Sequence, residues 1–210
     1  MFEDRYYEID GLSLPSVTTI LKIHNNPALN RWASNLGTEL SEQISEETAE
    51  IGKQIHSYVA GFIKSIAIPI LEWRQLSDEI KNGVRAYERF RLQTGFVGLA
   101  AEAIVYSLKY QYAGTLDAVG TIGDHRVLVD FKTGERFYPS MFAQVTAYYK
   151  AHCEKTEKDF PRIKELLVVN LNRNTGVPDI HQVKDIQPYW NYFKACLRLF
   201  YAAKKIENGN

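Results

Sequence analysis

Residues 112–132, YAGTLDAVGTIGDHRVLVDFK, have the pattern of a β-hairpin. Two runs rich in β-branched and other apolar residues, Tyr112–Ile122 and His125–Lys132, are separated by the dipeptide Gly123-Asp124. A two-residue connection that begins with glycine is typical of a tight hairpin turn. The sequence therefore predicts a pair of antiparallel strands in the middle of the chain.

The expected register of this hairpin places two carboxylates side by side. If Ile122 pairs with His125, then Asp117 lies directly opposite Asp130, and directly opposed residues have Cβ atoms about 4.5–5.5 Å apart. Period-two alternation puts Lys132 on the same face. Facing carboxylates repel each other unless a cation lies between them. Lys132 supplies part of that charge, and a divalent metal with hard oxygen ligands, Mg²⁺ or Mn²⁺, could supply the rest.

The alternative is that the two acids belong to a solvated edge hairpin. Aspartate is disfavoured inside strands, and Asp130 directly follows the apolar run Val127-Leu128-Val129. This context favours a functional pair over a solvated one.

The rest of the chain predicts helices before this hairpin and a mixture of helices and strands after it. Ser16 is a candidate N-cap for a helix over 17–23, and apolar residues at three- and four-residue steps from Ile51 to Ile66 predict an amphipathic helix. Further helices are expected at 28–36, 78–92, 140–151 and 188–205, and further strands at 5–9, 102–106, 165–172 and 180–183. This order favours an α/β class, with a central mixed sheet flanked by helices and a helical N-terminal part, in a single domain over 1–210.

Composition excludes several classes of protein. The 210 residues carry 25 Lys plus Arg and 25 Asp plus Glu, so binding to nucleic acid through bulk positive charge is excluded. Two cysteines are too few for a disulfide scaffold or a four-thiolate metal site. The first residues include acids and no apolar core, and the apolar stretch 66–71 is broken by Pro69. We therefore expect no targeting segment, no membrane partner and a cytoplasmic location.

Five motifs, in order along the chain, resemble a known nuclease superfamily. Gly114-Thr115-Leu116-Asp117, Asp130-Phe131-Lys132-Thr133-Gly134 and the pair Gln144 and Tyr148 resemble the PD-(D/E)xK nucleases. The segment GKQIH at 52–56 resembles the helical histidine signature of the RecB-like branch. The segment LPSVTTIL at 14–21, followed by Arg31-Trp32, is similar to mitochondrial genome maintenance exonucleases and related bacteriophage exonucleases. The resemblance covers about two thirds of the chain and implies a restriction-endonuclease-like core.

The resemblance implies a metal site and a catalytic lysine. Asp117, Asp130, the backbone carbonyl of Phe131 and His56 would hold the metal, and Lys132 would assist hydrolysis. Without the resemblance, a lone helical histidine is more often a satisfied or surface residue. Lys132 could instead reach solvent as an ordinary strand lysine. Gly52, one turn before His56, leaves room for the helix to approach the sheet.

Other implied site residues have plainer alternatives. Glu102 is a candidate metal contact, direct or through water, and a surface glutamate is nearly as good an interpretation. Gln144 and Tyr148, four apart on one helical face, are assigned to DNA contact and to organising the active site. The alternative is an amphipathic helix whose tyrosine packs on the sheet.

Further DNA contacts are expected outside these motifs. Arg85 and Arg89 lie on a basic helical stripe that could follow phosphates or, equally, form a solvated face paired with acids. Arg31, Trp32, Ser16 and Thr18 could hold a strand end through charge, stacking and helix N-terminal amides.

The implied function is a metal-dependent DNA exonuclease that uses Mg²⁺ or Mn²⁺. It would act on single-stranded DNA or a free end and leave 5′-phosphate and 3′-hydroxyl ends, in replication, recombination or repair. No iron–sulfur cluster is implied, and a bacterial cell or a phage-infected host is the expected setting. The alternatives are a structure-specific or site-specific endonuclease of the same fold and a non-catalytic DNA-end-binding protein.

Overall fold

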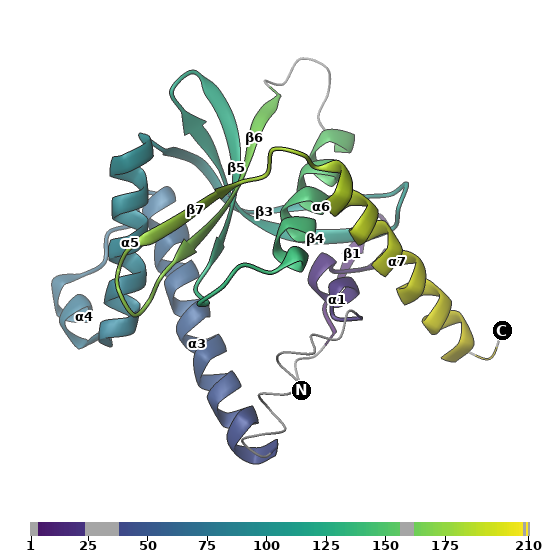
Figure 1. Cartoon of the computed structure of the whole chain (residues 1–210), viewed down its shortest axis with the longest axis horizontal. Coiled ribbons are helices and arrows are strands. Elements are labelled where there is room, and N and C mark those ends of the chain that lie inside the picture. The colour runs from purple at the N-terminus through teal and green to yellow at the C-terminus, as the bar shows by residue number, and fades with distance from the viewer. Residues whose placement is uncertain (1–3, 24–37, 156–161, 208, 210) are drawn as a thin grey trace.

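The computed structural model describes residues 4–23, 38–155, 162–207 and 209, and its centre is a mixed five-stranded sheet (Figure 1). The strands lie in the order β3-β4-β5-β6-β7, and only β5 and β6 are parallel. Their bounds are Val97–Ser107, Tyr112–Ile122, His125–Lys132, Ile163–Leu171 and Pro178–Gln182. The predicted α/β class and the central mixed sheet are confirmed.

Helices cover both faces of the sheet, as Figure 1 shows. On one face, α3 (Thr38–Ile63) and α5 (Asp78–Thr94) bury a core that includes Ile55, Phe90 and Phe131. On the other, α1 (Val17–Leu21), α6 (Pro139–Lys155) and α7 (Gln187–Glu207) pack around Leu128 and Phe193. Alternating residues of β5 enter the two cores, so its charged residues face the α6 side.

The hairpin register is confirmed, but its ladder is shorter than predicted. Ile122 pairs with His125 and the pairing continues to Ala118 and Val129, where it ends one pair before the two acids. Beyond that point β5 pairs only with β6, while β4 continues along β3. Asp117 and Asp130 are therefore not a ladder pair; they lie where two strands diverge. The backbone N–H of Phe131 donates instead to Oδ2 of Asp117, at 2.7 Å.

At this point the side chains of β4 also change the face of the sheet toward which they point. Leu116 packs in the core beneath α6, whereas Ala118, two residues later, packs in the core beneath α3 and α5. Strict period-two alternation, on which the shared face was predicted, therefore breaks at Asp117. On β3 the corresponding residue is Glu102, whose φ of 55° is left-handed and costs about 1–3 kcal/mol for a residue other than glycine.

The N-terminal residues dock onto β4. The strand expected at 5–9 is present as β1 (Tyr6–Ile9), and it pairs with β2 (Leu12–Pro15), a strand that was not predicted. Ser16 forms a bridge to Ala113 of β4. The predicted N-cap is confirmed, because the side chain of Ser16 accepts a hydrogen bond from the Thr19 N–H at 2.9 Å. The segment thereby becomes one wall of the site.

The helical predictions differ from the structure between residues 63 and 75. Helix α3 ends at Ile63 rather than continuing to Ile66, because Ser65 adopts a left-handed φ of 62°, and Ile66 is 60% exposed. The short helix α4 (Ile70–Gln75) follows Pro69 and was not predicted. The expected helix over 28–36 lies outside the described residues. Within the described part of the chain, no helix has the length and apolar character needed to cross a membrane.

Candidate active site

A cleft of about 800 Å³ opens where β4 and β5 diverge. It is bordered by α3, by the N-terminal hairpin with α1, and by α6, so each layer of the fold contributes to it. Most of the predicted site residues line it: Ser16, Thr18, His56, Glu102, Asp117, Phe131, Lys132, Gln144 and Tyr148. Asp130 lies beneath the cleft and is fully buried.

Lys132 is held by two neighbours. Its Nζ lies 2.7 Å from Oδ2 of Asp130 and donates to Oε1 of Gln144 at 3.1 Å. The Gln144 amide also donates to Oδ1 of Asp130 at 3.1 Å and to the Tyr148 hydroxyl at 3.0 Å. Because Gln144 and Tyr148 are one turn apart on α6, the helix fixes the lysine against the sheet. The four predicted residues form one network.

Asp117 contacts the opposite wall of the cleft. Its Oδ1 lies 3.5 Å from Nδ1 of His56 on α3. Burial alone would lower the pKa of His56, but the charge and the hydrogen bond of Asp117 outweigh it and raise this pKa above 6.5. Burial likewise opposes ionisation of Asp117, yet His56, Lys132 and the Phe131 N–H hold its pKa below 3.8. The pair thus favours the carboxylate form of Asp117.

The ionised form of Asp130 is the least favourable charge in the site. Burial raises its pKa to about 6, Lys132 opposes this shift, and the neighbouring Asp117 carboxylate adds to it. Its Oδ2 is buried and accepts no hydrogen bond from the described residues, although the Lys132 ammonium is its close ion partner. A second cation near this oxygen would relieve the repulsion between the two carboxylates.

The donor atoms fit a hard divalent cation. Carboxylate oxygens of Asp117 and Asp130 and the Phe131 carbonyl match the oxygen preference of Mg²⁺ or Mn²⁺, and the His56 imidazole adds one nitrogen donor. Among the residues that the structure describes, however, no three His, Cys, Asp or Glu side chains already form a closed cluster that could hold a metal. Asp130 is instead engaged by Lys132 and Gln144.

Glu102 lies at the rim of the cleft rather than in its floor. Its side chain is 52% exposed, and its carboxylate pairs with Nζ of Lys64 at 2.6 Å. Its left-handed backbone is at the β3 position between the residues paired with Leu116 and Ala118. This places it next to Asp117 along the sheet.

Two predicted DNA contacts lie away from the cleft. On α5, Arg89 donates to the carbonyl of Gly176 at 2.7 Å and Arg85 donates to Asn82 at 3.1 Å, and neither arginine lines the cleft. Arg89 therefore supports the turn before β7, and both arginines lie outside the cleft. Arg31 and Trp32 lie outside the described residues.

Three residues that sequence reasoning missed also line the cleft. The Tyr7 hydroxyl is hydrogen-bonded to Oγ1 of Thr115 at 2.8 Å, and Arg5 stacks over the Tyr7 ring. Tyr7 and Thr115 are 108 residues apart in the sequence. No local pattern could have joined them.

Glycines permit the close packing around the site. A Cβ on Gly52 would lie 3.0 Å from Oγ1 of Thr133, which confirms that this glycine lets α3 approach the sheet. A Cβ on Gly114 would overlap the ring of Tyr148. Gly114 therefore sets how near α6 lies to β4.

We expect Gly114→Ala to destabilise the protein by about 1–3 kcal/mol, because the added methyl group must displace the ring or the strand. Urea unfolding followed by circular dichroism measures this change. Gly134→Ala is the matched control, since a Cβ there meets nothing within 4 Å, and we expect it to change stability by less than about 0.5 kcal/mol. Equal effects of the two substitutions would contradict the packing argument.

Comparison with known proteins gives a distant structural likeness. No protein-family model and no curated protein sequence matches the chain. Among solved structures, the chain is similar to the crystal structure of an alkaline exonuclease, LHK-Exo, from Laribacter hongkongensis. Identity is 14%, the match covers 86% of this chain and 92% of that chain, and the TM-score is 0.37. At this level of similarity, the functional conclusion depends on the geometry of the cleft itself.

Proposed function

We propose that the protein is a metal-dependent DNA exonuclease that hydrolyses phosphodiester bonds of single-stranded DNA. The observation that carries the proposal is the meeting of Asp117, Asp130 and Lys132 at the point where β4 and β5 diverge. Two carboxylates and a lysine, joined to a histidine and an amide in one cleft, match the chemistry that phosphodiester hydrolysis needs. The same residues carry the resemblance to RecB-like PD-(D/E)xK nucleases.

Asp117, Asp130, the Phe131 carbonyl and His56 would hold the cation, and Glu102, at the rim of the cleft, is a further candidate. Mg²⁺ or Mn²⁺ bound there would lower the pKa of water and polarise a phosphoryl oxygen. His56 must present a neutral nitrogen to act as a ligand. The cofactor proposal therefore predicts competition between the cation and the proton that Asp117 favours on His56.

Lys132 would place positive charge against the phosphoryl oxygens as negative charge develops on them. Gln144 holds the ammonium in position, so the lysine needs no rearrangement when the substrate binds. Tyr148, whose pKa is raised by burial and by the nearby carboxylates, remains a neutral phenol and can donate a hydrogen bond.

The reaction forms a bond between a water oxygen and phosphorus and breaks the bond to the 3′ oxygen. The leaving oxygen takes up a proton, and the products are a 5′-phosphate and a 3′-hydroxyl. No oxidant or other co-reactant is needed.

Two competing functions use the same cleft. An endonuclease of this fold would cut within a strand, and a non-catalytic protein would bind a DNA end without cutting it. The close placement of Asp117 and Asp130 argues against the second, because a protein that only binds polyanions gains nothing from two adjoining carboxylates. Replication, recombination and repair would each supply a suitable DNA end.

Hydrolysis of 5′-labelled linear single-stranded DNA, compared with a closed single-stranded circle, tests the proposal. We expect the linear strand to be degraded with Mg²⁺ or Mn²⁺, the circle to remain intact, and EDTA to stop the reaction. Cutting of the circle would establish the endonuclease instead. Binding of the linear strand without hydrolysis under any of these conditions would establish the DNA-end-binding protein.

A further inference from the structure

We infer that Arg5 binds the phosphate next to the scissile one, so that Arg5, Tyr7 and Thr115 form a second phosphate subsite in the cleft. The inference rests on the proposed function, since it names how that site would hold its substrate. Its ligand is an unesterified oxygen of a phosphodiester linkage, recognised through charge and independently of the base.

The Arg5 backbone is fixed at both of its polar groups. Its N–H donates to Oγ1 of Thr19 at 2.9 Å, and its carbonyl accepts from the Ser16 N–H at 2.8 Å. The residue just before β1 is thereby tied to the start of α1. The side chain consequently leaves the wall of the cleft from a defined point.

The guanidinium is held near the sheet but stays accessible. It lies 4.8 Å from the centre of the Tyr7 ring, and its Nη2 donates to Oγ1 of Thr115 at 3.4 Å. Arg5 as a whole is exposed, whereas Tyr7 is 8% exposed. Stacking and one long hydrogen bond orient the guanidinium and leave its other N–H groups available to a ligand.

Charge distinguishes Arg5 from the other cations of the cleft. Lysines 132, 22 and 53 also line it, and each lies within 4 Å of a carboxylate, on Asp130, Asp4 and Glu50 respectively. Among the described residues, Arg5 has no carboxylate within that distance. An arginine that has no carboxylate partner among the described residues is suited to an anionic ligand.

The position of Arg5 matches the spacing of a nucleic acid strand. Thr115, which its guanidinium contacts, precedes Asp117 by two residues on β4, a distance of about 6.6 Å along a strand. Neighbouring phosphates of an extended DNA strand are separated by a similar length. A phosphate hydrolysed at Asp117 therefore places the next one within reach of Arg5.

Binding of a fluorescent single-stranded oligonucleotide, measured by anisotropy at several salt concentrations, tests the inference without hydrolysis. The measurement uses the Lys132→Ala background with Mg²⁺. We expect Arg5→Ala to weaken binding about 10- to 100-fold. We also expect it to reduce the slope of log K against log salt by about 0.7, the value for one lost phosphate contact on a single strand.

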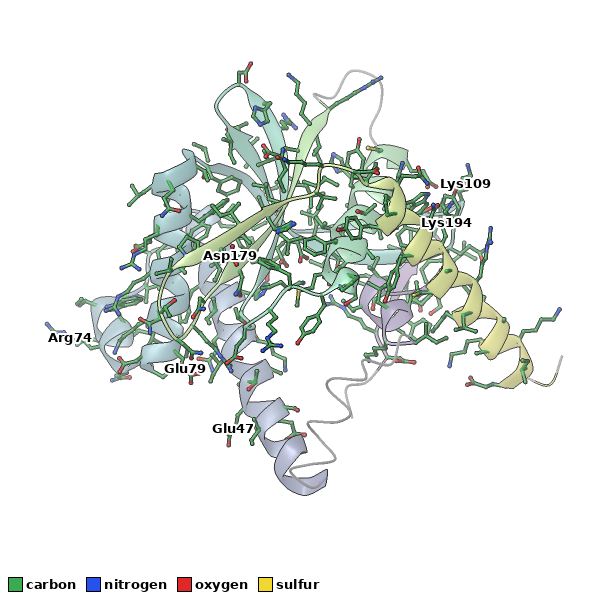
Figure 2. All side chains as sticks on the ribbon, in the orientation of Figure 1. Glu47, Arg74, Glu79, Lys109, Asp179 and Lys194 are labelled. Atoms are coloured by element: carbon green, nitrogen blue, oxygen red, sulfur yellow. The ribbon has the colours of Figure 1, made fainter. Side chains whose placement is uncertain are left out.

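Two further variants separate charge from structure. Arg5→Lys keeps the positive charge, so its salt slope should match that of the parent while its affinity is intermediate. Lys194→Ala removes a cation that also stacks on an aromatic ring, that of Trp190, but lies on α7 outside the cleft (Figure 2). We expect no change for Lys194→Ala. An unchanged slope for Arg5→Ala, or an equal loss for Lys194→Ala, would overturn the inference.

Neutral linkages then locate the contact on the substrate. We would place one methylphosphonate at each linkage on either side of the scissile phosphate. At one of these linkages, the methylphosphonate should greatly weaken binding to the protein that keeps Arg5. It should hardly weaken binding to Arg5→Ala, because the neutral linkage and the substitution remove the same interaction. Additive losses at every position would contradict the subsite.

The two proposals can fail separately. Wild-type protein that binds DNA through Arg5 but never hydrolyses it would refute the nuclease and keep the subsite. Wild-type hydrolysis with binding that is indifferent to Arg5→Ala would keep the nuclease and refute the subsite.

Discussion

Hydrolysis of single-stranded DNA by the Lys132→Ala variant is expected to fall by about 10²- to 10⁴-fold, the range typical of losing a positioned charged or proton-transferring group. The ammonium of Lys132 is the ion partner of Asp130, and Gln144 holds it in place. Its removal takes away the charge that would stabilise the developing negative charge at phosphorus. Single-turnover cleavage of a 5′-labelled oligonucleotide with Mn²⁺ measures the loss.

Folding must be checked in the same experiment, because Asp130 loses its ion partner. We expect the pKa of Asp130 to rise further and the melting temperature of Lys132→Ala to fall. Lys132→Gln, whose amide can still donate to Asp130, should recover stability without recovering cleavage. Lys164→Ala, at an exposed position of β6, is the control for a lost strand lysine. Wild-type cleavage by Lys132→Ala would exclude the proposed catalytic lysine.

The second large effect concerns the cation, and it is independent of catalysis. We expect Mn²⁺ at about 100 times its dissociation constant to stabilise the wild-type protein by about 2.7 kcal/mol. For a protein of this length that corresponds to a rise of about 5–10 °C in melting temperature. Asp117→Asn should abolish the rise, because an amide oxygen lacks the charge of a carboxylate. Differential scanning fluorimetry with Mn²⁺ and with EDTA measures it.

Asp117→Asn should leave the strands in place, since an amide oxygen can still accept the hydrogen bond from the Phe131 N–H. Asp124→Asn is the matched control, because Asp124 is an exposed acid in the turn of the same hairpin. It should keep the full response to Mn²⁺. An undiminished response in Asp117→Asn, or none in the wild type, would count against the proposed metal site.

The hairpin was predictable because its signals are local. Gly123-Asp124 fixes the turn, and the β-branched residues on either side fix the strands, so the bounds and the register follow from 21 consecutive residues. The end of the β4–β5 pairing at Ala118 and Val129, where the two strands diverge, was not predictable in this way. It depends on β5 pairing with β6, whose residues lie more than 30 positions later in the chain.

The same distinction applies to the candidate site. Gln144 and Tyr148 share a helical face by their spacing, and Ser16 has the chemistry of an N-cap, so their sequence neighbours suffice to place them. Arg5 reaches the cleft only because β1 docks beside β4, a contact between segments 110 residues apart. Long-range docking of this kind leaves no periodic trace in a sequence.

The divergence of β4 from β5 has a consequence for local opening. Hydrogen exchange and proteolysis act first on fraying ends and loops, whereas central strands open only when the whole domain unfolds. The proposed ligands on β4 and β5 are in the second class, although the two strands no longer pair with each other there. Beside Asp117, β4 stays paired with β3, and at Asp130, β5 stays paired with β6. Hydrogen bonds with the Phe131 N–H and with Gln144 hold the two carboxylates. A cation would therefore find its carboxylates already ordered, and would spend little of its binding free energy on organising the chain.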